Sequence, residues 1–337
     1  MRDLAFWIGS GLVIAAAYVL TLLVTNEYLF FAGYVVLQFI VLATAWNILG
    51  GYAGYVNFGT AAFVGLGTYC SVALVKAFAL PLPLQVLAAA AIGAALGFAT
   101  GLLTLRLRGI FYSIATVALT IIVETFIINW KFVGGAAGIQ LMRPPPTQPF
   151  ISYIQYLFVF GVVMAVIAVA IARYIEGSWI GRGLKAIRDD ELAAECSGVP
   201  TLRLKLIACA LSGALMCAAG APNPMYFQFA IPSAAFDLNY SVAPLAMSLI
   251  GGTAHWLGPV MGAILLGVTQ QLLTVTISSE LNLLVLGIML VLFVVGAPDG
   301  ILGLARRAKA LFSPRARSSP QSDATPVAAK PADGGGR

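Results

Sequence analysis

Long uncharged stretches dominate this chain, and isolated charged residues separate them. The stretches cover residues 4–26, 28–75, 77–105, 144–172, 206–236, 238–279 and 281–298. A helix that crosses a lipid bilayer needs about 20 predominantly apolar residues. Several of the stretches are therefore long enough to cross a bilayer twice.

Ten membrane-spanning helices are predicted from these stretches. We place them at residues 4–24, 28–49, 56–75, 83–105, 110–130, 150–172, 205–221, 239–253, 258–276 and 282–303. The segment 239–253 is the shortest of them. The pattern predicts an all-α polytopic membrane protein whose transmembrane domain covers residues 1–304.

One polar segment, residues 177–204, interrupts the hydrophobic pattern, and we call it the insert. Six basic and five acidic residues lie between Arg173 and Lys205, counting both ends. Such a nearly balanced mixture favours docking to a protein over binding to lipid headgroups. A solvated loop with some local helix is the alternative interpretation.

Two apolar stripes run through the insert, and they are out of phase. The first contains Ile180, Leu184 and Ile187, and the second contains Leu192, Cys196 and Val199. At 100° per residue the second stripe is turned by about 120° from the first, so one straight helix would bury only one of them. The insert is therefore predicted to form two short helices that meet near Asp189 and Asp190, either of which can cap the second helix. Gly198 and Pro200 end that helix.

Composition and charge support a membrane protein and give it an orientation. Hydrophobic residues make up 60% of the chain, charged residues make up 9%, and the mean hydropathy is +0.95. These values exclude a soluble globular domain. If Arg2 lies inside, only Lys76, Lys131 and Arg143 of the 19 basic residues fall outside. The positive-inside rule then predicts that both termini and the insert are cytoplasmic.

The C-terminal segment, residues 305–337, is predicted to be a disordered basic tail in the cytoplasm. It contains too little apolar surface to fold. Its first part, residues 306–317, carries most of the basic residues of the tail. We expect this part to lie on anionic membrane lipid.

Polar residues within the apolar stretches are candidates for a translocation path. Tyr52, Asn57 and Thr60 lie among glycines at a helix boundary, where irregular backbone at membrane depth requires a cover of protein or a water-filled cavity. Glu124 is an intramembrane carboxylate, and Asn129 lies near the same helix end. Close helix packing through small residues and a structural hydrogen bond from Glu124 are the alternatives.

Motifs for covalent chemistry are absent from the sequence. None of the six lysines follows a glycine, so there is no GxxxxGK[ST] phosphate loop. There is no HExxH motif, cysteine pair or serine elbow. The four cysteines and His255 are interpreted as packing residues. We expect a chain that is not an enzyme and has no cofactor, no metal site and no nucleic-acid partner.

Five motifs together resemble the LivM-type permease subunits of branched-chain amino acid ABC importers, over about residues 38 to 303. They are GGYAGYVNFGTAAFVGLGTY at 50–69, a set from Leu107 through Glu124 to Gly138, GRGLKAIRDDELAAECSGV at 181–199, a set from Gly251 to Ala263, and PDGILG at 298–303. The sequence departs from the family pattern at Tyr55, Asn57, Thr60, Val133 and Ala254. These departures lie beside the predicted path, so urea, amides or other amino acids stay open as substrates.

The resemblance implies a subunit of an importer in the cell inner membrane. The expected partners are a paralogous permease, two ABC ATPase subunits, a periplasmic substrate-binding protein and membrane lipid. The residues expected to couple the permease to the ATPases are Arg188, Asp190, Glu191, Ala193, Ala194 and Gly198. Both alanines are small enough for the second insert helix to enter a groove on an ATPase. An ion-coupled secondary transporter, with Glu124 as its carrier, is the competing class.

Overall fold

A computed structural model describes residues 2–24, 26–104, 109–143 and 150–276, with isolated positions among 284–303. The predicted tail at 305–337 and most of the predicted span at 282–303 lie outside the described residues. So do Arg106 and Arg108, which support the predicted orientation.

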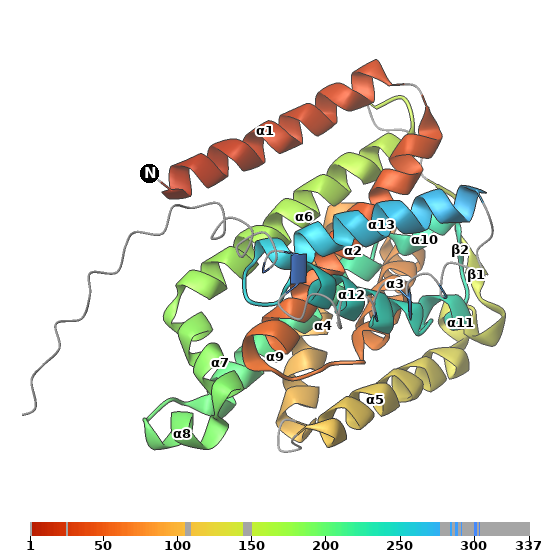
Figure 1. Ribbon diagram of the computed structural model, residues 1–337. Helices are drawn as coiled ribbons and strands as arrows, with labels where there is room; N and C mark the ends of the chain where they lie inside the picture. Colours follow the sequence, from red (N-terminus) through yellow and green to blue (C-terminus); the bar gives the residue numbers. More distant parts are fainter. Residues whose placement is uncertain are drawn as a thin grey trace, which may run out of the picture.

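Helices make up nearly all of the described chain (Figure 1). The long ones are α1 (Arg2–Leu23), α2 (Glu27–Ala53), α3 (Thr60–Phe78), α4 (Leu82–Thr104), α5 (Ile110–Asn129), α6 (Tyr153–Gly177), α9 (Thr201–Gly220) and α13 (Leu257–Thr276). Shorter helices are α7 (Trp179–Asp189), α8 (Glu191–Cys196), α10 (Asn223–Phe227), α11 (Pro232–Ala235) and α12 (Asn239–Gly251), with 3₁₀ turns η1 (Lys131–Val133) and η2 (Gly135–Ala137). The strands β1 (Ile139–Gln140) and β2 (Phe229–Ala230) pair antiparallel.

Seven helices in the described residues are long and apolar enough to cross a membrane. They confirm the predicted all-α polytopic class. The prediction of a spanning helix at 239–253 is wrong, because α12 has 13 residues and measures only about 20 Å at 1.5 Å per residue. A hydrocarbon core is about 30 Å thick. The predicted set of ten therefore loses one span, and the location of the termini stays a prediction.

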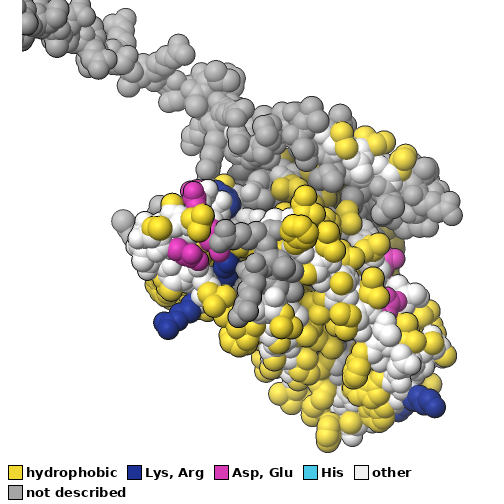
Figure 2. Space-filling model, turned by 90° about the horizontal axis from the view of Figure 1, so that it is seen from below, with side chains coloured by type: hydrophobic (Ala, Val, Ile, Leu, Met, Phe, Trp, Pro, Cys, Tyr) yellow, Lys and Arg dark blue, Asp and Glu magenta, His cyan; other side chains and the backbone are white. Residues whose placement is uncertain are grey.

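The central element of the bundle is α2, which is buried along most of its length. It packs against α6, α9, α12 and α13, whereas α1 lies at the outside and packs mainly on α6 (Figure 1). Many hydrophobic side chains and few charges lie on the described surface in Figure 2, as expected for a chain surrounded by lipid.

Close approach explains the glycines around the α12–α13 turn. A Cβ atom at Gly251 would overlap the carbonyl oxygen of Gly258, and one at Gly262 would overlap that of Met247. Of the two interpretations left open by the sequence, the structure therefore supports close packing at these positions.

The two ends of the bundle differ. At one end α7 and α8 project beyond the long helices, and at the opposite end lie β1, β2 and the short helix α10 (Figure 1). Acidic and basic side chains gather mainly at the α7–α8 end (Figure 2). The predicted insert is therefore a protruding structure at one end of an apolar bundle.

Candidate functional site

The insert forms two helices that join at Asp190, as its two stripes predict. Ser178 caps α7 by accepting a hydrogen bond from the Gly181 N–H at 3.4 Å. The carboxylate of Asp190 accepts from the backbone N–H groups of Leu192 at 2.9 Å and Ala193 at 3.1 Å. Asp190 has extended backbone angles, so it ends α7 and begins α8. Gly198 follows with φ of +82°, a left-handed value that favours glycine.

The exposed face of α8 differs from the predicted one. We expected the second apolar stripe, which contains Leu192, Cys196 and Val199, to be buried. Leu192 is instead 58% exposed, and Cys196 is also exposed. Ala194 is instead buried against its own chain, with 5% exposure. This burial does not favour the expected contact of Ala194 with an ATPase, which stays a prediction. Ala193 is exposed. Its contact with an ATPase is part of the function proposed below.

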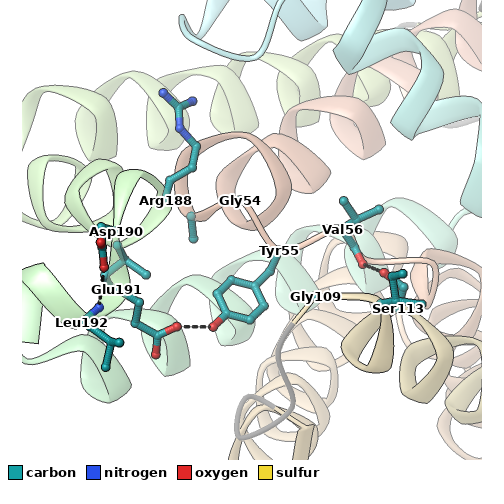
Figure 3. A pocket seen from close by; sticks show the side chains of 12 residues that line it. Gly54, Tyr55, Val56, Gly109, Ser113, Arg188, Asp190, Glu191 and Leu192 are labelled. Carbon is teal, nitrogen blue, oxygen red and sulfur yellow. Dashed lines mark hydrogen bonds between the residues drawn. The ribbon is translucent and has the colours of Figure 1, made fainter.

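An ion pair between Lys205 and Glu191 attaches the start of α8 to the bundle, and Figure 3 shows the hydrogen bond of Tyr55 to the same carboxylate. The Lys205 ammonium donates to Glu191 Oε1 at 2.7 Å, and the Tyr55 hydroxyl donates to Glu191 Oε2 at 2.8 Å. Lys205 also reaches the Tyr55 oxygen at 3.2 Å. Only 4% of the Lys205 side chain is exposed, and a charge at such a position is tolerated when it is paired and hydrogen-bonded. We call these three residues the Glu191 cluster.

The Tyr55 phenol lies between two opposite charges. Burial raises its pKa most, and the hydrogen bond to Glu191 raises the pKa further, whereas Lys205 lowers it. The net shift is upward, so the phenol keeps its proton at neutral pH and acts as the donor to Glu191.

Arg188 makes a second connection between the insert and the end of α2. Its guanidinium donates from Nη1 to the Gly51 carbonyl oxygen at 3.0 Å. Its Cγ lies 2.8 Å from the position that a Cβ atom would take at Gly54. Gly54 also has φ of +78°, so both its backbone and its surroundings require glycine.

Glu176, at the end of α6, makes a third connection. Its Oε2 accepts from the Trp256 N–H at 2.7 Å and from the Tyr52 hydroxyl at 3.4 Å. Lys185 Nζ lies 3.9 Å from Oε1. One carboxylate therefore joins α6, α7, the end of α2 and the α12–α13 turn.

A cavity of about 520 Å³ separates the insert from the rest of this end. The segments that line it are 53–56, 109–113 and 187–192. Figure 3 shows Tyr55 and Glu191 directed toward each other beside it, while Ser113 bonds to Val56 on the far side. The insert therefore contacts the bundle at defined points, with space between them.

Three of the predicted path residues are buried: Asn57 and Thr60 at the start of α3, and Tyr52 near the end of α2 beside Glu176. Trp46 Nε1 donates to the Asn57 carbonyl oxygen at 2.8 Å, so residues 54–59 turn back along α2 before α3 begins. The Asn57 side chain accepts from the Gly59 N–H at 2.7 Å. Tyr52 and Thr60 are each 0% exposed. In this conformation these residues face protein and do not line an open channel.

Several buried polar groups in this centre have no hydrogen-bond partner. Within the described chain they include the hydroxyls of Thr44 and Thr60, whereas the amide of Asn47 lies beside the Tyr52 hydroxyl. Nearby Ser241, on α12, is satisfied, since its hydroxyl donates to the Phe58 carbonyl oxygen at 2.6 Å and accepts from the Ala61 N–H at 3.1 Å. Unpaired buried polar groups are uncommon and costly, and they are typical of sites that bind water or solute.

The other two predicted path residues lie elsewhere on α5. Thr116 packs beside Gly59 and accepts from the Phe58 N–H at 3.1 Å. Glu124 lies two helical turns beyond Thr116, about 12 Å along the axis, and is partly exposed. Asn129 is exposed, and its amide donates to the Thr125 carbonyl oxygen at 2.8 Å. The structure does not bring these two residues together with Thr60.

Three residues with a clear place in this site were not predicted as site residues. Glu176 and Lys205 were counted only as part of a charge mixture that favours docking to a protein, and Ser241 was not singled out. The sequence does place Glu176 and Lys205 at the junctions between the insert and the apolar helices. A charged residue at such a junction is either exposed or paired, and this could have marked them as site candidates.

Comparisons with known proteins give one family. Residues 28–294 match the family described as branched-chain amino acid transport system permease component. The chain is 26% identical over 305 residues to the high-affinity branched-chain amino acid transport system permease protein LivM of Salmonella typhimurium, covering 83% of this chain and 71% of that protein. It is 27% identical over 298 residues to LivM of Escherichia coli, covering 80% and 68%.

A third relative comes from an archaeon. A probable branched-chain amino acid transport permease protein LivH of Methanocaldococcus jannaschii is 25% identical over 265 residues, covering 74% of this chain and 83% of the relative. No solved structure matches the chain.

Proposed function

This chain belongs to the family of permease components of branched-chain amino acid transport systems, and we propose that it forms the translocation path of an ATP-driven importer and couples that path to ATP hydrolysis. It is a multi-pass inner-membrane protein of a transport family and not of a catalytic one. The proposed cargo is a branched-chain or other hydrophobic amino acid. Urea or another amide is the second candidate, because Tyr55, Asn57 and Thr60 depart from the family pattern.

The proposed assembly contains a second, paralogous permease, two ABC ATPase subunits and a periplasmic substrate-binding protein. In it α8 docks on an ATPase through its exposed face, with Leu192 and Ala193 in contact. Burying an exposed Leu side chain contributes roughly 1.5–3 kcal/mol, so an apolar face of this kind favours a protein partner.

The observation that carries the proposal is the contact between Glu191 and Tyr55. Glu191 is the first residue of α8, and Tyr55 begins the segment that leads through Asn57 to the start of α3. A displacement of α8 by an ATPase therefore acts directly on this segment. Arg188 and Asp190 transmit the same movement, because one holds the end of α2 and the other joins the two insert helices.

Opening of the path would supply partners for the unpaired groups at the centre. When residues 54–59 move away from α2, water or solute can reach the Thr60 hydroxyl, which has no hydrogen-bond partner among the described residues. The transition is thus a rigid-body change between two packed states, driven by differential contacts with the ATPase.

Substitution of an exposed alanine tests the docking. Ala193→Arg adds a long charged side chain to α8 without entering the interior of the chain. We expect ordinary amounts in the membrane, together with loss of the ATPases on purification or ATP hydrolysis without uptake. Ala136→Arg, at an exposed alanine of η2 at the opposite end of the bundle, is the matched control. Wild-type ATPase retention and uptake in Ala193→Arg would contradict docking through this face.

A further inference from the structure

A second cavity lies at the end of the bundle opposite the insert, and we call it the outer cavity. Its volume is about 490 Å³, within the range typical of small-molecule sites. Five aromatic rings, four carboxamides and one carboxylate line it, and none of the described residues in its wall is basic. These residues come from α2, α10, α11, α13 and the region where α12 begins.

The aromatic wall is held in place by its own contacts. The rings of Phe31 and Tyr226 stack with their centres 4.2 Å apart, and the Tyr226 hydroxyl donates to the Phe31 carbonyl oxygen at 3.1 Å. Across the cavity wall, Phe39 stacks against Tyr240 at 6.3 Å. A ligand therefore meets preformed apolar surfaces with fixed orientations.

Gln38 supplies a directed polar group in this wall. It is 6% exposed, and its Nε2 donates to the Ala219 carbonyl oxygen at 2.9 Å and to Asn223 Oδ1 at 2.7 Å. Both donors of this amide are therefore engaged. Its Oε1 is the atom left to accept a hydrogen bond from a ligand.

Asp237 supplies a negative charge at the rim. One of its oxygens accepts from the Asn239 N–H at 2.7 Å. No Lys or Arg in the described parts of the chain forms a salt bridge with it. A carboxylate close to aromatic faces is a favourable environment for an ammonium group, because both attract a cation.

We propose that the outer cavity binds an α-amino acid with an apolar side chain. The ammonium group lies against Asp237 and Gln38 Oε1, the amides of Asn239 and Gln271 donate to the carboxylate, and the side chain packs between Phe31 and Phe39. This inference rests on the proposed function and narrows its cargo. Urea and simple amides have no ammonium group, so they leave Asp237 unpaired and bind less well.

A smaller cavity of about 290 Å³ adjoins the first and shares Phe227, Ala234 and Tyr240 with it. A series of hydrogen-bonded, buried side chains runs along both cavities. Gln38 donates to Asn223, and the Asn223 amide reaches Thr68 Oγ1 at 3.5 Å. The smaller cavity therefore offers a second polar contact to a ligand that leaves the outer cavity toward α3.

Ligand protection of an introduced cysteine tests the site in the assembled importer. Ala234→Cys is placed in a Cys196→Ser background, which removes the exposed native cysteine that the structure describes. We expect leucine to slow the reaction of Cys at 234 with a thiol reagent severalfold and acetamide to leave it unchanged. Ser233→Cys, exposed beside the cavity but not lining it, is the matched control and should show no protection.

Charge removal identifies the group that binds the ammonium. Asp237→Asn keeps an oxygen to accept from Asn239, and it should weaken protection by leucine roughly 10- to 100-fold, the range expected for loss of a hydrogen bond to a charged group. Three results would each overturn the proposal. They are equal protection of the cysteines at 233 and 234, no reaction of the cysteine at 234 in the absence of ligand, and an unchanged dependence of protection on leucine concentration in Asp237→Asn.

The same preparation separates this inference from the proposed function. ATP-driven leucine uptake with wild-type affinity in Asp237→Asn would reject the outer cavity and leave the importer intact. Absence of ATP-driven uptake by the wild-type assembly, with leucine protection still present at 234, would reject the importer and leave a ligand site.

Discussion

The Glu191 cluster and the centre around Thr60 are both buried, but their polar groups are satisfied to different degrees. In the Glu191 cluster the carboxylate, the ammonium and the phenol all bond to one another. The Thr60 hydroxyl, in contrast, is buried and lacks a hydrogen-bond partner among the described residues. This difference fits the proposed function, in which the Glu191 cluster holds fixed contacts and Thr60 gains a contact when the path opens.

Substitutions in the two regions should also have different costs in folding stability. Removing one member of a satisfied buried pair leaves an uncompensated charge, whereas removing an unpaired hydroxyl leaves nothing unsatisfied. Substitutions in the Glu191 cluster should therefore reduce stability, and those around Thr60 should act mainly on transport.

The largest loss of stability is expected for Ala194→Arg. Ala194 is buried against its own chain, so an arginine here adds both volume and an unpaired charge, with a combined cost on the order of 4 kcal/mol or more. Thermal unfolding of the purified permease in detergent measures this. Ala193→Arg, on the exposed face of the same helix, should unfold like the wild type, and equal losses in the two variants would contradict the assigned orientation of α8.

Lys205→Met should cause the second-largest loss of folding stability, about 3 kcal/mol. Methionine replaces the apolar stem of lysine but leaves Glu191 without its cation. The double variant Lys205→Met with Glu191→Gln should recover part of the loss, because the unpaired charge is then absent. A double variant less stable than either single variant would show that the charges are not paired as described.

Tyr55→Phe should cost roughly 1–2 kcal/mol, since it removes one hydrogen bond to a charged acceptor and keeps the ring. The Lys205–Glu191 pair remains in this variant. Denaturant titration followed by tryptophan fluorescence gives the change, and a loss as large as that of Lys205→Met would mean that the hydroxyl is more important than the ion pair.

Thr60→Val should have the smallest effect on stability, less than about 0.5 kcal/mol, because its hydroxyl has no partner to lose. Uptake should nevertheless fall, since the group is proposed to contact water or solute in the open state. Ser241→Ala is the contrasting variant, with two hydrogen bonds removed and a measurable loss of stability. Normal uptake by Thr60→Val would remove this residue from the path.

Local pattern was sufficient to predict the break in the insert. The phase shift between the stripe at Ile180 and the stripe at Leu192 depends only on neighbouring residues, and so does the capping by Asp190. The orientation of α8 was not predictable in this way. An apolar stripe can be covered by its own chain or by another protein, and periodicity is the same in both cases.

Contacts between residues far apart in the chain could not be predicted from the sequence. The burial of Lys205 depends on Glu191 and on Tyr55, which is 150 positions away along the chain. The outer cavity likewise combines residues of α2 with residues more than 180 positions later. A single sequence contains no signal that identifies such pairs of neighbours. Lys205 was therefore counted only among the charges that favour docking to a protein.

The proposed coupling between α8 and the 54–59 segment runs through Tyr55 and Glu191. A double-mutant cycle with Tyr55→Phe and Glu191→Gln in the reconstituted importer, read as the amount of amino acid taken up per ATP hydrolysed, measures this coupling directly. Each single variant should hydrolyse ATP with a lower uptake ratio, and the double variant should be no worse than the more defective single one. Independent, multiplicative losses, or an unchanged ratio in both single variants, would contradict the account.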